Sequence, residues 1–163
     1  MARKTVEKPP KGLAYDKALG LLARREHSTR ELKTKLALRG HDKAESVVAI
    51  DRLKDQQYQS DDRFAASLAR RRGAQGYGPR RIGAELRSHG LHDAAIRAVL
   101  AEVDLEWIAI ASAQSRKRFG TGVSPDKAER AKRADFLLRR GFDPATVRAV
   151  TRAEVDDPGQ NFD

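Results

Sequence analysis

The sequence predicts an all-α protein made of three tandem three-helix repeats that form an elongated, curved array. An internal repeat carries this prediction, because glycines that close similar segments, Gly40, Gly90 and Gly141, lie about 50 residues apart. No stretch shows the apolar–polar alternation, bounded by turns, that half-buried strands require. Three short helices bury little apolar surface alone, so neighbouring repeats are expected to stack along one continuous seam.

The repeated element is a helix that ends at a glycine and is followed by another helix. A leucine stands four residues before each closing glycine, as Leu36, Leu86 and Leu137. The glycines are expected at the helix ends with positive φ, a conformation that costs glycine little. Two aliphatic residues three positions apart follow each one: Val47 and Ile50, Ile96 and Val99, and Val147 and Val150.

The first repeat is expected over residues 13–57, after a basic N-terminal arm over 1–12. Its second helix opens with Ser28 and Glu31, the pattern of a capping box, and its third opens similarly with Asp42 and Glu45. Its first helix presents one apolar face, formed by Ala14, Ala18, Leu21 and Leu22.

The second repeat is expected over residues 58–103, following a break near 57–60. Pro79 after Gly78 predicts the start of its middle helix, since proline at the first helical position loses no hydrogen bond. The helix before it carries its apolar face on Phe64, Ala65 and Leu68.

The third repeat is expected over residues 104–151, after a break near 103–104, and an acidic tail over 152–163 follows it. Pro125 after Ser124 predicts a helix start of the same kind. The apolar face of the first helix is expected on Leu105, Ile108 and Ala111, and Trp107 and Tyr58 are expected in core or helix-anchoring positions.

Aliphatic residues on the predicted helix faces should form the core. Truncating any one of them to alanine should lower stability by about 2 to 5 kcal/mol. The set comprises Leu32, Leu36, Ile50, Ile82, Leu86, Val99, Leu137 and Val150.

Charge indicates the kind of partner. The chain has 33 Lys and Arg against 23 Asp and Glu, a formal net charge of +10, which favours DNA, RNA or an acidic protein surface. It has no cysteine, which excludes disulfides and thiolate chemistry and fits a cytoplasmic location. No apolar stretch approaches the roughly 18 residues that span a bilayer, so no membrane partner is expected. The protein is also expected to be a monomer.

Candidate catalytic groups do not cluster in the sequence. The four histidines, His27, His41, His89 and His92, are dispersed and are expected to be exposed or to cap helices. A phosphate-binding loop is absent, because the glycines of 73–78 lack the Lys-Ser/Thr ending and the flanking strand of such loops. The sequence therefore predicts that the protein is not an enzyme and needs no metal or cofactor.

Clustered basic residues form the candidate site. Any single cluster could be only a solvated face, but several flank the glycine-rich connectors, where stacking could align them. The contact residues expected to bind carboxylates or phosphates are Arg70, Arg71, Arg72, Arg80, Arg81, Arg116, Lys117, Arg118, Arg139 and Arg140.

Two modes of nucleic-acid binding are alternatives. A helix-turn-helix reader is disfavoured, because the third helix of the first repeat mixes Glu45, Asp51 and Asp55 with its lysines and arginines. Stacking on single-stranded bases would need exposed rings among basic residues, for which Tyr77 and Phe119 are the more open candidates.

Three motifs resemble a known family. They are the pattern Arg-x-x-Ser-x-x-Glu-Leu-x-x-Lys-Leu over 25–36, Asp61-Asp62 followed by Phe64-Ala65, and Arg-Arg-Gly-Phe over 139–142. In this order and spacing they are similar to the bacterial RecX family over about residues 14–150. Gln57-Tyr58-Gln59 departs from the family's usual Gly-Tyr-Leu or Gly-Tyr-Ile, and the N-terminal arm lies outside the match.

The resemblance implies a regulator of the RecA recombinase. Such a protein binds the RecA filament on single-stranded DNA, limits its extension, ATPase and strand exchange, and acts in recombination and the DNA-damage response. The resemblance implies no catalytic residues. An autonomous DNA- or RNA-binding helical module and a structural adaptor remain alternative interpretations of the residues alone.

Overall fold

The computed structural model describes residues 13–153, and in that range the chain forms nine α-helices and no strand. This confirms the all-α prediction. The chain divides into two compact units, Met1–Phe64 and Ala65–Asp163. The expected basic arm over 1–12 and the tail from 154 onward lie outside the described residues.

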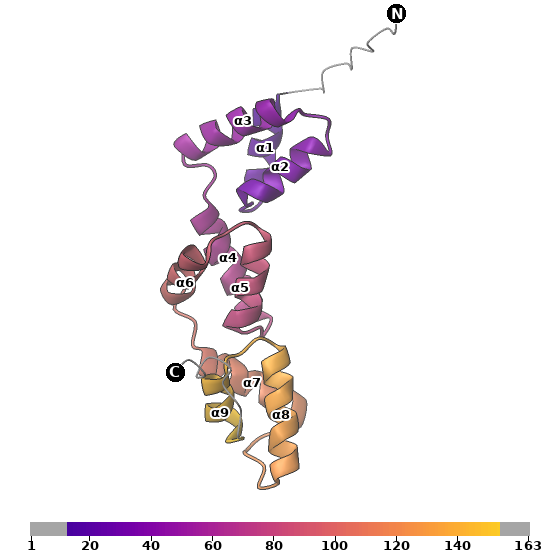
Figure 1. Ribbon diagram of the computed structural model, residues 1–163, viewed down its shortest axis with the longest axis vertical. Helices are drawn as coiled ribbons and strands as arrows, with labels where there is room; N and C mark the ends of the chain where they lie inside the picture. The colour runs from indigo at the N-terminus through magenta and orange to yellow at the C-terminus, as the bar shows by residue number, and fades with distance from the viewer. Residues whose placement is uncertain (1–12, 154–163) are drawn as a thin grey trace, which may run out of the picture. The chain divides into compact units, whose positions relative to one another are not determined.

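The first three helices are α1 (Ala14–Leu22), α2 (Thr29–Ala37) and α3 (Lys43–Asp55) (Figure 1). The predicted caps are present, because the Ser28 side chain accepts a hydrogen bond from the Glu31 amide and Asp42 accepts one from the Glu45 amide. The Glu45 carboxylate, in turn, accepts the amide N–H of Ala14 at 3.1 Å, which ties the start of α1 to α3.

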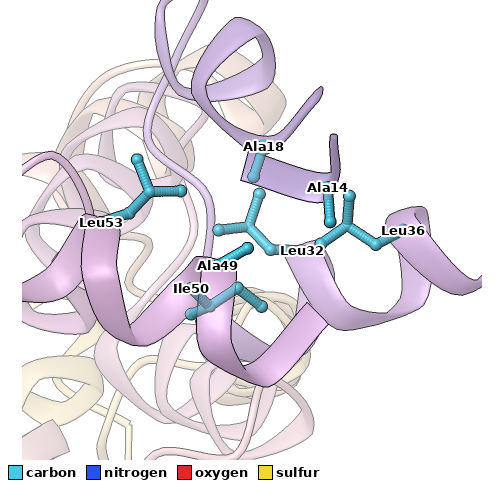
Figure 2. Close-up of a cluster of buried hydrophobic side chains, with 7 residues drawn as sticks. All are labelled: Ala14, Ala18, Leu32, Leu36, Ala49, Ile50 and Leu53. Atoms are coloured by element: carbon cyan, nitrogen blue, oxygen red, sulfur yellow. The ribbon is translucent and has the colours of Figure 1, made fainter. Parts of the chain in front are cut away.

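Small and large aliphatic side chains fill the space between these three helices. Leu32 and Leu36 of α2 lie opposite the small Ala14 and Ala18 of α1, and α3 closes the cluster (Figure 2). Alanine on α1 allows close approach of the helices, while Leu21 and Leu22 pack against the cluster from its edge and are only partly buried. The full cluster is Ala14, Ala18, Leu32, Leu36, Ala49, Ile50 and Leu53.

The next helices are α4 (Asp61–Ala74), α5 (Pro79–Ser88) and α6 (Asp93–Glu102). Pro79 stands at the first position of α5, as predicted. The predicted face of α4 is buried at Phe64, Ala65 and Leu68. Tyr58 was expected in the core or anchoring a helix end. It is 53% exposed and so is not in the core, but it follows the end of α3, where its amide donates to the carbonyl of Leu53 at 2.9 Å.

The last helices are α7 (Trp107–Phe119), α8 (Lys127–Arg139) and α9 (Pro144–Thr151). The predicted helix start at Pro125 is wrong, because the Asp126 side chain caps α8 by accepting the amides of Ala128 and Glu129. The helix therefore begins after Asp126.

The apolar face of α7 also differs from the prediction. Asp104 has a positive φ of 49°, so the chain turns there and Leu105 precedes the helix. Ile108 then faces solvent at 55% exposure, while Ala111 is buried and Trp107 and Ile110 pack against the core from its edge. Trp107 thus has the packing role predicted for it.

Seven of the eight predicted core residues are buried, with side chains at 0 to 4% exposure. Val150 is only partly buried, but it packs against the cluster formed by α7, α8 and α9. The closing glycines have the predicted positive φ, at 84° for Gly40, 88° for Gly90 and 91° for Gly141.

The histidines differ from the prediction in part. His89 ends α5 and His92 precedes α6, as expected of capping positions. His27 and His41 are instead buried, and the Nδ1 atom of each lies close to the carboxylate of a glutamate four residues further along, Glu31 and Glu45. Burial lowers the pKa of His27 below its ordinary value of 6.5, and the nearby Glu31 carboxylate opposes that shift.

Candidate partner-binding surface

All ten predicted contact residues belong to the second compact unit, Ala65–Asp163. They lie at or near helix ends: 70–72 late in α4, 80 and 81 at the start of α5, 116–118 in the last turn of α7, and 139 and 140 at the end of α8. Arg72 and Arg140 are partly buried, and the other eight are exposed.

Arg72 is engaged inside the chain. Its Nε and Nη2 atoms donate to the two carboxylate oxygens of Glu85 at 2.8 and 2.6 Å, and its Nη1 donates to the side-chain oxygen of Gln75 at 2.8 Å. Hydrogen bonds from Arg72 lower the pKa of Glu85, and the same bonds raise the pKa of Arg72. The pair joins α4 to α5.

This ion pair predicts an acid-dependent stability. A folded-state pKa below the ordinary 4.5 means that Glu85 stabilises the fold fully above pH 4.5 and loses this contribution as the pH falls through the lowered value. We expect Glu85→Gln to lower the free energy of unfolding at pH 7 by about 1 kcal/mol. The measurement is urea unfolding at pH 7 and at pH 3. The difference in the free energy of unfolding between wild type and variant should be smaller at pH 3, and a difference of equal size at both pH values would contradict the prediction.

Arg140 is held by the segment that follows α4. Its Nε donates to the carbonyl oxygen of Gly76 at 2.9 Å, and its Nη2 donates to that of Gln75 at 2.8 Å. The guanidinium lies 4.7 Å from the ring centre of Tyr77, and that of Arg81 lies 4.2 Å from the same ring. Two predicted contact residues are thus brought together on Tyr77 by cation–π interactions.

Backbone contacts join the same two segments. The amide of Gly78 donates to the carbonyl of Arg140 at 2.8 Å, and the amide of Arg80 donates to that of Gly141 at 2.9 Å. A side chain on Gly141 could not fit, because its Cβ would lie 2.6 Å from the backbone nitrogen of Arg81. We call this contact between 76–81 and 140–142 the glycine joint.

A pocket of about 480 Å³ opens beside the glycine joint. Its walls come from the end of α4, from α7 and from α8, and it gathers three of the predicted contact residues, Lys117, Arg118 and Arg140. The remaining lining residues are Ala74, Gln75, Gln114 and Phe136.

The other predicted residues do not line this pocket. Arg70, Arg71, Arg80, Arg116 and Arg139 are exposed on the helix ends described above, so the ten residues do not all line this pocket. Gln75, Gln114 and Phe136 were not predicted. No local signal marks them, because their neighbours across the pocket are distant in sequence, as Arg140 is from Gly76 at 64 residues.

Two arginines outside the ten predicted contact residues have a structural role. Arg133 is buried and donates to the carbonyl of Gly122 at 2.7 Å, and its guanidinium lies 5.5 Å from the ring centre of Phe119. Arg130 donates to the carbonyls of Ser124 and Pro125 at 3.1 and 2.8 Å. These two arginines hold the α7–α8 connection, and Phe119 is engaged in the same contacts.

Within the described residues, no group of three or more His, Asp or Glu side chains could hold a metal ion. None of the helices in that part of the chain is both long enough and apolar enough to cross a membrane.

Fold and surface together define an all-α protein of successive three-helix domains with basic helix ends in the second unit. Three family models match it in succession, namely the first three-helix domain of RecX at residues 14–53, the second at 60–100 and the third at 104–151. The chain belongs to the RecX family.

Named relatives agree with this assignment. The regulatory protein RecX of Xanthomonas citri is 47% identical over 141 residues, which cover 86% of this chain and 87% of the relative. That of Stenotrophomonas maltophilia is 42% identical over 150 residues, 92% of each chain. The crystal structure of RecX from Lactobacillus salivarius shares the fold, with a TM-score of 0.71 at 19% identity, over 84% of this chain and 91% of the other.

Proposed function

We propose that this protein regulates the RecA recombinase by binding the RecA filament on single-stranded DNA and limiting its extension, ATPase and strand exchange. Membership of the RecX family carries the proposal, since all three domain models match in order. The protein would act in the cytoplasm, as a monomer, in recombination and the DNA-damage response.

The charges of the second unit support a polyanionic or acidic partner. Exposed arginines and Lys117 at the ends of α4, α5, α7 and α8 can form charge-assisted hydrogen bonds with carboxylates or phosphates. Several such weak contacts act together when the partner is itself a repeating assembly, because each bond after the first forms at high effective concentration. A filament is a partner of this kind.

A protein that limits filament growth should act when it is much less abundant than RecA. We expect the protein, added at well below the RecA concentration, to inhibit the ATPase of RecA on single-stranded DNA, because one bound molecule blocks addition at a filament end or holds several protomers in one state. The measurement is the ATP hydrolysis rate during titration of the protein at constant RecA and DNA.

Excess single-stranded DNA provides the control for this titration. Inhibition that excess DNA does not relieve supports action on the filament, and inhibition that DNA relieves indicates competition for the strand. No effect at saturating protein would contradict the proposal. The chain would then be assigned to the autonomous nucleic-acid binding class, whose signature is tight, steeply salt-dependent binding to DNA that leaves RecA activity unchanged.

A further inference from the structure

We propose that the pocket beside the glycine joint binds one nucleotide of a single-stranded nucleic acid. Lys117, Arg118 and Arg140 would hold the phosphate, and Phe136 with the glutamine amides would contact the base. This deepens the proposed function by giving the protein its own contact with the strand on which the filament forms. The contact itself does not require RecA.

The lining of the pocket is selective for anions. Of its seven lining residues three are cationic, two carry neutral amides, and none is acidic. In a recess the charges are less screened than on an open surface, so three cations with no acidic residue among the described lining residues raise the local concentration of phosphate. Lys117 and Arg118 are exposed at the end of α7, where the helix dipole also favours positive side chains.

Arg140 is positioned before any ligand arrives. Two backbone carbonyls accept from its Nε and Nη2, and the rings of Tyr77 and Phe136 lie 4.7 and 5.6 Å from its guanidinium carbon. These contacts fix the plane of the guanidinium at the wall of the pocket. A fixed arginine binds an anion with less loss of side-chain entropy than a freely moving one.

Size and amide chemistry favour a nucleotide over the carboxylate of an acidic protein. The volume of about 480 Å³ falls in the range of about 300 to 1,000 Å³ of small-molecule sites, and a single carboxylate would leave most of it unfilled. The oxygen of the Gln75 side chain already accepts from Arg72, so its NH₂ group remains as a donor. Amides and a ring contact unstacked bases in single strands, whereas duplex bases are stacked and paired.

Direct binding to a labelled single-stranded oligonucleotide, without RecA, tests the proposal. The variant Lys117→Ala/Arg118→Ala should bind at least about tenfold more weakly in fluorescence anisotropy, because two phosphate contacts are lost. The slope of log affinity against log salt should fall by about 1.4, since each contact with a single strand contributes about 0.7. The double variant Arg24→Ala/Lys33→Ala removes the same charge from exposed positions in the first unit and should retain the affinity and slope.

A second variant keeps every cation. Gln114→Glu has nearly the same shape but places a carboxylate in the pocket, so it should also weaken oligonucleotide binding while the helix content and thermal midpoint stay at wild-type values. Binding by Lys117→Ala/Arg118→Ala equal to that of its control would overturn the proposal. A pocket variant that loses RecA inhibition but keeps oligonucleotide binding would also overturn the proposal, because the pocket would then bind an acidic protein surface.

Failure of the proposed function is a separate outcome. In that outcome the wild-type protein leaves the RecA ATPase unchanged. The anisotropy comparison contains no RecA, so its result does not depend on that outcome. Oligonucleotide binding that depends on the pocket, beside an unaffected ATPase, would uphold the nucleotide site and reject the regulatory proposal.

Discussion

Gly141→Ala is expected to destabilise the second compact unit by about 2 to 5 kcal/mol. Alanine at a φ of 91° costs about 1 to 2 kcal/mol in backbone strain. Its Cβ would also overlap the backbone of Arg81, and forcing side-chain atoms into packed space costs about 1 to 3 kcal/mol more. Urea unfolding followed by the fluorescence of Trp107, the only tryptophan, measures the change in this unit.

Substitutions at two other glycines separate the cost of backbone strain from the cost of steric overlap. Gly40 lies at the equivalent helix end of the first repeat, with a φ of 84°. No atom lies within 4 Å of the position that a Cβ would occupy. Gly40→Ala should therefore cost only the backbone strain of about 1 to 2 kcal/mol. Gly20 lies inside α1 with open space around it, so Gly20→Ala should stabilise by about 0.5 to 1 kcal/mol. A cost at Gly141 no larger than at Gly40 would refute the close contact with Arg81.

Leu36→Ala is expected to lower the free energy of unfolding by about 2 to 5 kcal/mol. Leu36 is fully buried in the cluster between α1, α2 and α3, and the neighbouring Ala14 is too small to fill the space that the lost atoms leave. Circular dichroism during urea unfolding measures the loss of helix.

Leu38 provides a matched control two residues away. It follows α2 and is 82% exposed, so Leu38→Ala should change the free energy of unfolding by less than about 0.5 kcal/mol. Similar effects of the two substitutions would show that the cluster of the first repeat is placed incorrectly.

The helices and most of the core follow from local signals. Ser28 and Asp42 cap helices through neighbours three residues away, and Gly40 and Gly90 end helices through their own backbone preference, so a short window of sequence contains the cause. The predicted start of α8 was wrong because Asp126 competes with Pro125 within one turn. The expected elongated, curved stacking of the repeats stays a prediction.

The pocket could be predicted only in part. The basic clusters are visible in sequence, but nothing local distinguishes Arg133, which is buried against loop carbonyls, from Arg118, which is exposed at the pocket. The difference arises from chain segments that meet only in the folded unit. Arg72 likewise has the sequence surroundings of a contact residue, and only the fold brings it against Glu85, thirteen positions later.

The glycine joint also sets the order in which the chain can fold during synthesis. Arg140 and Gly76 are 64 residues apart, and closing a loop of that length costs about 4 kcal/mol in chain entropy before any contact forms. The cluster of the first repeat joins only residues 14–53, so all of its residues leave the ribosome well before those of the joint. On the ribosome the first repeat can therefore fold while translation continues, whereas the joint must wait for residue 142 to emerge, and until then the segment over 76–81 is available to chaperones and proteases.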